Sequence, residues 1–214
     1  SAVAGDEGSV SVVVHNLADG RYAAVDEAHV YYAASTYKLA VLFEAFRQVE
    51  SGEQDFAKVL TLEHKYVEND LGTLEFLGLH EGDTLTLADA LRAMIVVSDT
   101  PTAVLLQDTL GPERIDAMLE SLGITETRFN THDLPATARD MARLLEAVAA
   151  GEDVSEESRL AMLSLLLKED IADGVIFGVP EGAPVAHKSG SFYNATHDIA
   201  LVWGPAGPYI IAVM

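Results

Sequence analysis

Residues 8–27 open the chain with alternating apolar and polar positions that are rich in valine. The alternation breaks at Asp19-Gly20, a pair typical of the tight turn of a β-hairpin, so the segment predicts two antiparallel strands. From Ser35 onward the apolar residues recur with helical spacing until Gly52, a residue type that often follows the end of a helix. The positions that define this helix are Leu39, Leu42, Phe43, Phe46 and Val49.

Helical spacing continues through the middle of the chain. Residues 86–97 predict a helix that ends before Ser98. Thr100 followed by Pro101 reads as the N-cap and first residue of the next helix, which Gly111 ends. Ser98 should therefore lie in a short break between two helices. Further helices are expected at 112–123, 137–151 and 155–168, with Thr137 and Ser155 as the caps of the last two.

Beyond Asp170 the apolar spacing shortens again, and glycine, proline and asparagine separate three segments that read as strands, at 183–192, 196–205 and 208–214. Strands at both ends with helices between them predict an α/β (α+β) chain. We expect residues 1–34 and 170–214 to form one discontinuous sheet subdomain and residues 35–169 a helical subdomain. The active site should lie at their boundary.

Composition excludes several classes of function. The chain has 214 residues, is 49% hydrophobic and has a formal net charge of -21, which disfavours nucleic acid and anionic lipid as partners. No apolar run approaches the ~20 residues that span a bilayer. The sequence contains no cysteine, and its seven histidines never occur four residues apart. We therefore predict no thiol chemistry, no metal and no cofactor.

Ser35 and Lys38 are the first candidates for chemistry, because they lie one helical turn apart at the start of the first helix. The positive end of the helix dipole favours negative charge that develops at Ser35. Lys38 can accept the serine proton if burial and a nearby cation lower its pKa, and Lys188 is the candidate cation. Such a pair is common by chance, so it gains weight only from "SDT" at 98–100 and "KSG" at 188–190, which follow in order.

These three motifs resemble those of serine β-lactamases of class A type, within the superfamily that includes penicillin-binding proteins. The similarity extends to "LTLADALRAMIVVSDTPTAVLL" at 85–106, "SLGITETRF" at 121–129 and "PVAHKSGSF" at 184–192, and it covers nearly the whole chain. The resemblance implies a mixed antiparallel sheet with flanking helices beside an all-helical subdomain. It also implies a small-molecule substrate, either a β-lactam or a peptidoglycan-like peptide.

The resemblance also assigns roles to residues. Ser35 would be acylated, Lys38 would serve as its base, and Ser98 would pass a proton to the leaving nitrogen. Lys188 would help to hold the substrate carboxylate, together with Ser189 and Ser191. Gly190 and Thr100 would also bind the substrate, with Thr100 at the place of the family's asparagine, which contacts the acylamino group. The backbone N–H groups of Ser35 and Ser191 would form the oxyanion hole. Gly190 has no Cβ, which permits a close approach of its strand, and Asp99 would hold the loop around Ser98.

Three positions depart from the family pattern. Thr100 stands where the second motif usually has asparagine. Asp133 takes the register of the Ω-loop glutamate that activates water for release of the acyl group, in a loop about ten residues shorter than in relatives, with His132 as a reserve candidate. No Lys or Arg follows Lys188, so the arginine that binds the substrate carboxylate in many relatives has no counterpart.

The leading hypothesis is a serine hydrolase that opens the β-lactam amide through an acyl-enzyme on Ser35. The alternatives are a D-alanyl-D-alanine peptidase or small esterase, a penicillin-binding sensor that stays acylated, and an inactive interaction domain. The resemblance implies a secreted or periplasmic protein linked to antibiotic resistance or β-lactam catabolism. The sequence leaves the oligomeric state open, and we favour a monomer.

Overall fold

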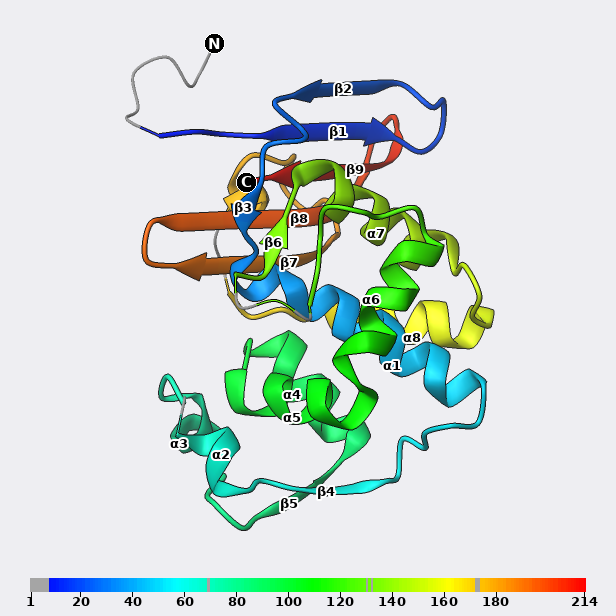
Figure 1. The fold of residues 1–214 in the computed structure, drawn as a ribbon. Coiled ribbons are helices and arrows are strands. Elements are labelled where there is room, and N and C mark those ends of the chain that lie inside the picture. Colours follow the sequence, from blue (N-terminus) through cyan, green and yellow to red (C-terminus); the bar gives the residue numbers. More distant parts are fainter. Residues whose placement is uncertain (1–7, 69, 130, 132, 172–173) are drawn as a thin grey trace.

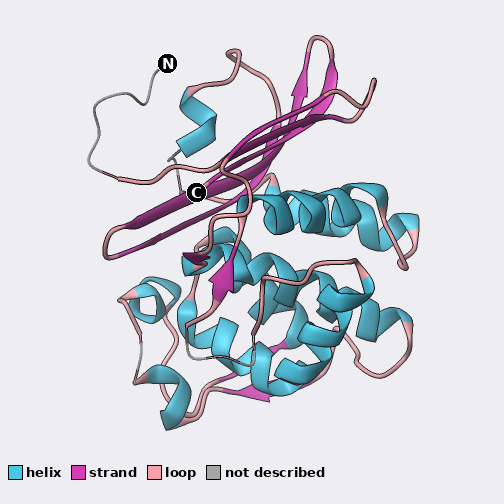
Figure 2. Cartoon of the chain, turned by 45° about the horizontal axis from the view of Figure 1, so that its top comes forward, coloured by secondary structure: helices cyan, strands magenta, loops and turns pink. Residues whose placement is uncertain are grey.

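The computed structural model describes residues 8–68, 70–129, 131, 133–171 and 174–214. A five-stranded antiparallel sheet with the strand order β2-β1-β9-β8-β7 lies in the upper part of the molecule as drawn (Figure 1). Most of the helices lie on one side of this sheet (Figure 2). The five strands are β1 (Val12–Asn16), β2 (Tyr22–Val25), β7 (Val185–Phe192), β8 (Ala195–Gly204) and β9 (Gly207–Val213).

The predicted hairpin at Asp19-Gly20 is confirmed. Strands β1 and β2 pair antiparallel, and Gly20 has a left-handed backbone (φ 72°) that suits glycine. The side chain of Asn16 accepts a hydrogen bond from the N–H of Ala18 (2.9 Å), which tightens the turn. Strand β1 then pairs with β9 on its other side, so strands from both parts of the chain share one sheet as expected.

The sheet buries one face against the helices. Helix α7 (Ala138–Ala150) packs along β8 and β9, and α8 (Glu156–Leu166) packs against β7. Below them, α1 (Lys38–Glu50) crosses the middle of the molecule (Figure 1). The sheet residues buried in this core are Val13, Ala186, Ile199, Leu201, Ile210 and Ala212.

The remaining elements complete the helical side. The helices are α2 (His64–Val67), α3 (Thr73–Leu77), α4 (Leu87–Val96), α5 (Thr100–Leu110) and α6 (Pro112–Ser121). Two short ribbons occur among them: β3 (Tyr31–Tyr32) pairs with β6 (Pro135–Ala136), and β4 (Val59–Thr61) pairs with β5 (Thr84–Thr86). The 3-10 helix η2 (Gly174–Phe177) packs against β8. The division into subdomains stays a prediction.

The helix caps were predicted with one error. Thr137 accepts a hydrogen bond from the N–H of Asp140, and Ser155 does so from Ser158, so both caps are confirmed. Thr100 is not a cap: Asp99 caps α5 and accepts a hydrogen bond from the N–H of Thr102 (2.7 Å). Aspartate and threonine both favour the N-cap position, and α5 begins one residue earlier than expected.

Among the residues that the structure describes, no helix has the length and apolar character that crossing a membrane requires.

Candidate active site

Ser35 lies within a single 3-10 turn, η1 (Ala34–Tyr37), that directly precedes α1. Neither η1 nor α1 has a side-chain capping hydrogen bond. Ala34 just before Ser35 has a left-handed backbone (φ 46°), a strained conformation for a residue with a Cβ. The turn therefore leaves the Ser35 hydroxyl available to other partners.

Lys38 supplies that partner, because its ammonium nitrogen reaches both candidate serines. Nζ lies 3.1 Å from Oγ of Ser35 and 3.1 Å from Oγ of Ser98, and it donates to the carbonyl of Ser98 at 2.6 Å. The residue is fully buried. Burial lowers the pKa of Lys38 to about 7, and the positive charge of Lys188 adds to this fall, while Asp99 and Glu169 oppose it. An amine with this pKa can exchange a proton with a serine hydroxyl near neutral pH.

Ser98 occupies the predicted break between α4 and α5, where it has a left-handed backbone (φ 55°). This conformation directs both its carbonyl and its hydroxyl to Lys38. Asp99, the cap of α5, fixes the break and also accepts a hydrogen bond from the hydroxyl of Thr73. Thr100 follows, with its Oγ1 3.5 Å from Nζ of Lys38. The second motif therefore lies beside the first.

The third motif lies on β7, the edge strand next to η1. A Cβ placed on Gly190 would lie 2.9 Å from the backbone nitrogens of both Ser35 and Thr36, closer than real Cβ contacts allow. The glycine thus permits β7 to run against the turn that carries the serine. Ser191, the next residue, is thereby brought to the same edge of the site, where it lines both cavities that open on Ser35.

Lys188 is fully buried and forms an ion pair with Glu169, whose side chain is also fully buried. The same carboxylate accepts hydrogen bonds from the N–H (3.0 Å) and the hydroxyl (2.8 Å) of Ser189. Burial lowers the pKa of Lys188, and the charge of Glu169 opposes this fall. Sequence reasoning missed Glu169, because no spacing rule connects it to the third motif.

His187 on β7 lies close to two buried carboxylates. Its Nδ1 lies 3.0 Å from Asp198 on the neighbouring strand and 3.7 Å from Glu169. Burial lowers the pKa of His187, but the hydrogen bond and charge of Asp198 outweigh this effect and raise the pKa overall. Asp198 in turn accepts a hydrogen bond from the N–H of Val175 in η2 (2.8 Å). His187 is thus a packed residue, and Asp198 was not predicted.

Two cavities open on Ser35. The first, of about 190 Å³, we call the hydroxyl cavity because serine and threonine side chains dominate its wall. The second, of about 560 Å³, we call the aromatic cavity because Tyr32, Tyr37 and Phe192 line it. The hydroxyl cavity is lined by Ser35, Leu71, Thr73, Ser98, Thr100, Ile171, Ser189, Gly190, Ser191 and His197.

Comparison with known proteins identifies the family. The model of the beta-lactamase enzyme family matches residues 1–214, the whole chain. The chain belongs to this family. The predicted fold class and a hydrolase that acts on β-lactams are thereby confirmed at the level of the family.

Solved structures agree with this family membership. An ancestral class A β-lactamase is 26% identical, with a TM-score of 0.87 over 96% of this chain and 84% of that one. The β-lactamase from Sphaerobacter thermophilus DSM 20745 is also 26% identical, with a TM-score of 0.86 over 97% of this chain and 82% of that one. PBP-A has the same fold at 24% identity, with a TM-score of 0.92 over 99% of this chain and 83% of that one.

The structure does not bring Asp133 to Ser35. This aspartate lies in an exposed turn and lines neither of the two cavities, whereas the next residue, Leu134, lines the aromatic cavity. Leu134 has a left-handed backbone (φ 37°), and its carbonyl accepts a hydrogen bond from Ala33, so the turn directs the leucine inward. His132 lies outside the described residues.

His197 is a second residue that sequence reasoning missed. It lies opposite Gly190 on β8, is 3% exposed and lines the hydroxyl cavity. Its Nε2 donates a hydrogen bond to the carbonyl of Tyr32 (2.9 Å), which fixes the tautomer of the neutral ring. Burial lowers the pKa of His197, while the carbonyls of Tyr32 and Thr196 oppose the fall. His197 thus connects the sheet to the segment that leads into η1.

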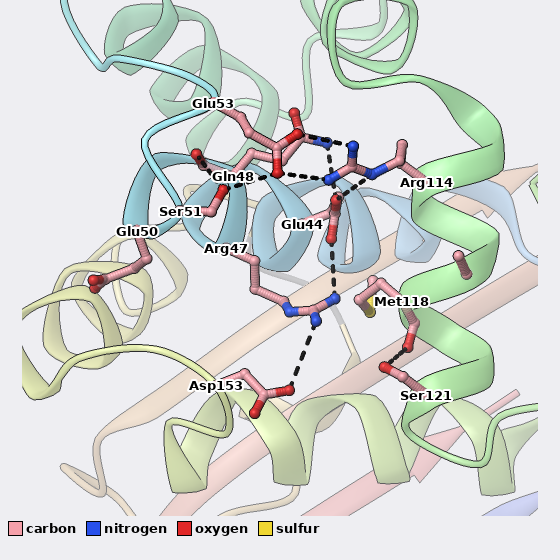
Figure 3. Close-up of a pocket in the computed structure, with 11 residues that line it drawn as sticks. Glu44, Arg47, Gln48, Glu50, Ser51, Glu53, Arg114, Met118, Ser121 and Asp153 are labelled. Carbon is pink, nitrogen blue, oxygen red and sulfur yellow. Dashed lines mark hydrogen bonds and ion pairs between the residues drawn. The ribbon is translucent and has the colours of Figure 1, made fainter.

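Another polar cavity, of about 470 Å³, lies at the far end of α1 from Ser35. Figure 3 shows Glu44 on α1 between two arginines, one on its own helix and one on α6. Glu44 pairs with Arg47 (3.2 Å), while Arg114 pairs with Glu53 (2.8 Å). These charges compensate one another, so we assign this cavity no part in the chemistry. Within the described part of the chain, no group of three acidic, histidine or cysteine side chains is arranged to hold a metal ion.

Proposed function

We propose that the protein hydrolyses β-lactams through an acyl-enzyme on Ser35. The observation that carries this proposal is the position of Lys38, whose buried Nζ lies 3.1 Å from the hydroxyl oxygens of both Ser35 and Ser98. In its neutral form, which a pKa of about 7 makes accessible, this amine is a suitable base for the serine.

In the first step, Oγ of Ser35 attacks the carbonyl carbon of the β-lactam while Nζ of Lys38 takes the hydroxyl proton. The backbone N–H groups of Ser35 and Ser191 would stabilise the oxyanion. The C–N bond of the ring then breaks, and the proton passes from Lys38 through the hydroxyl of Ser98 to the leaving nitrogen. The product of these transfers is an ester on Ser35.

The hydroxyl cavity suits the carboxylate of the substrate. Ser189, Ser191 and Thr100 line it. The hydroxyl of Ser189 donates to Glu169 (2.8 Å), which leaves the hydroxyl groups of Ser191 and Thr100 for the ligand. Nζ of Lys38 lies 3.5 Å from Oγ1 of Thr100, and Nζ of Lys188 donates to the carbonyl of Ser189 (3.0 Å). Because Lys188 is paired with Glu169, the hydroxyl groups carry more of the contact than in relatives that have an arginine. Binding of the carboxylate should accordingly be weaker.

Release of the acyl group requires an activated water molecule. Asp133 keeps the register of the family's catalytic carboxylate, which makes it the base that the resemblance implies. Its exposed turn lines neither cavity, which favours the second candidate function. That function is acylation with slow release, as in a penicillin-binding sensor or a D-alanyl-D-alanine peptidase. A mutant of PBP-A is described in an acyl-enzyme complex with penicillin G.

We further propose that the protein acts on its own as a monomer outside the cytoplasm, where β-lactams and peptidoglycan peptides occur. This location rests on the family alone. The net charge of -21 favours a small molecule as the partner over nucleic acid.

The deciding experiment follows turnover of a chromogenic cephalosporin and records the intact mass of the protein in the same samples. Continued turnover in wild type that is lost in Ser35→Ala supports hydrolysis. A single burst with a persistent mass adduct supports the sensor or peptidase instead. Ser121→Ala, on α6 and outside both cavities, is the matched control. If the protein shows no turnover and forms no adduct, the proposal is refuted.

A further inference from the structure

The aromatic cavity is the larger of the two cavities at Ser35, and the chemistry described above leaves it unused. Ser35 and Ser191, the two residues proposed for the oxyanion hole, line both cavities, as do Leu71 and Thr100. Ser98 and Ser189 line the hydroxyl cavity and not the aromatic cavity. A substrate whose carbonyl sits between Ser35 and Ser191 would have its carboxylate in the hydroxyl cavity. The opposite end of that substrate would enter the aromatic cavity.

Two exposed rings that line this cavity, Tyr32 and Phe192, lie side by side, and Tyr193 extends the row beyond the lining residues. The ring of Phe192 lies 5.4 Å from that of Tyr32 and 4.4 Å from that of Tyr193. The exposed fractions of Tyr32, Phe192 and Tyr193 are 38%, 43% and 93%. Adjacent exposed rings of this kind mark surfaces that bind apolar groups, since each ring offers a large face at low entropic cost. Leu71, on another segment of the cavity wall, is 76% exposed as well.

The charged groups that line the aromatic cavity are acidic. Glu68 and Asp70 contribute carboxylates, and the described residues of its wall include no lysine, arginine or histidine. Asp70 is held in place because its Oδ1 accepts hydrogen bonds from the N–H (3.1 Å) and hydroxyl (3.2 Å) of Thr73. A negative charge on a ligand would therefore be repelled here, whereas a neutral or positive group would be accepted.

We propose that the aromatic cavity binds the acyl side chain of the substrate and selects an aromatic group that carries no negative charge. This inference rests on the proposed function, and it adds the class of β-lactam on which Ser35 acts. The rings of Phe192 and Tyr32 stack with the aromatic group of the substrate. Glu68 and Asp70 repel a negatively charged substituent next to the aromatic group of the substrate.

Four penicillins test this selection, because they share one nucleus and differ only in the acyl side chain. Benzylpenicillin has a neutral phenyl side chain, ampicillin adds an ammonium group beside the ring, and carbenicillin adds a carboxylate there. 6-Aminopenicillanic acid has no acyl side chain. The measurement is the second-order acylation rate of each compound, from stopped flow or intact mass. We expect carbenicillin to acylate roughly tenfold more slowly than ampicillin, with the gap narrowing at high salt.

Two substitutions separate the contributions of the rings and the charge. Phe192→Ala should slow benzylpenicillin about fivefold without changing the rate for 6-aminopenicillanic acid. Its control is Phe177→Ala, since Phe177 is a 76% exposed phenylalanine on η2 that does not line the cavity.

Glu68→Gln should reduce the difference in acylation rate between ampicillin and carbenicillin. Its control is Glu63→Gln, which removes an equal charge at the opposite end of α2 and outside the cavity.

The outcomes distinguish this inference from the proposed function. If all four penicillins acylate Ser35 at similar rates, or carbenicillin is the fastest, the selection is refuted while the proposed function stands. If Phe192→Ala slows 6-aminopenicillanic acid as much as benzylpenicillin, the ring does not bind the side chain. If none of the four acylates the protein, the proposed function fails and this inference fails with it.

Discussion

Lys188 and Glu169 form a fully buried ion pair behind strand β7. The carboxylate also accepts both hydrogen bonds that Ser189 offers, through its N–H and its hydroxyl, so one side chain holds two consecutive residues of the third motif. The pair reduces the positive potential that Lys188 contributes to the site. Burial is the main cause that lowers the pKa of Lys38 and the charge of Lys188 is the second, while the charge of Glu169 opposes both.

Glu169→Gln should destabilise the protein. Loss of the carboxylate leaves the ammonium group of Lys188 buried without a counter-charge, which costs about 3 kcal/mol in the free energy of unfolding. Urea unfolding followed by circular dichroism measures this change. Glu181→Gln removes an exposed carboxylate from a turn and is the control. Equal unfolding midpoints for the two variants would contradict the importance of the buried pair.

The acylation rate should depend on pH through Lys38. The base must be neutral, and the pKa of Lys38 is lowered from its ordinary value of 10.5 to about 7. Acylation is therefore expected to rise with pH and to level off above about pH 8, with an apparent pKa of about 7. Stopped-flow acylation across this range checks the profile. A rate that does not change between about pH 5.5 and 8.5 would exclude Lys38 as the base.

Gly190→Ala should slow acylation without unfolding the protein. The added methyl group would lie 2.9 Å from the backbone nitrogens of Ser35 and Thr36, so β7 and η1 must separate by a few tenths of an ångström or more. Displacements approaching ~1 Å at a reacting centre can cost about 100-fold in rate. Gly178→Ala, where the added atom meets an ordinary contact at 3.6 Å, should leave the rate unchanged. Thermal unfolding of both variants separates misfolding from misplacement.

Asp133→Asn should leave the release of the acyl group unchanged within about twofold, because an exposed side chain outside both cavities cannot position the water. Single-turnover hydrolysis of the acyl-enzyme measures this step separately from acylation. A loss of about 100-fold would instead support Asp133 as the base and would require its turn to move toward Ser35.

The features that sequence predicted correctly are local or follow from the family's motifs. The Asp19-Gly20 turn and the caps at Thr137 and Ser155 depend on a few neighbouring residues, and such signals survive folding. The meeting of Ser35 with Ser98 was expected from the resemblance, which links motifs that no spacing rule connects.

The features that sequence missed arise from contacts between distant segments. Glu169 and His197 have unremarkable neighbours in the sequence. The register of β7 against β8 brings His197 to the site, and the packing of α8 against β7 brings Glu169, which follows α8. Asp99 and Thr100 are both good capping residues, so residue type alone could not decide which one begins α5. Ser35 lies in a 3-10 turn because the chain turns sharply at Ala34, which apolar spacing does not report.

The pairing of β9 between β1 and β8 has a consequence for the order of folding. Helix α1 and its 3-10 turn form from contacts between near neighbours, so the segment that carries Ser35 can become structured early. Strands β7, β8 and β9 pair through short hairpins. The closure of β9 onto β1 and the packing of β7 against η1 instead join segments from opposite ends of the chain, so these contacts form slowly. The ability to react with a β-lactam is therefore expected to appear in the slowest phase of refolding, after helical circular dichroism has already recovered.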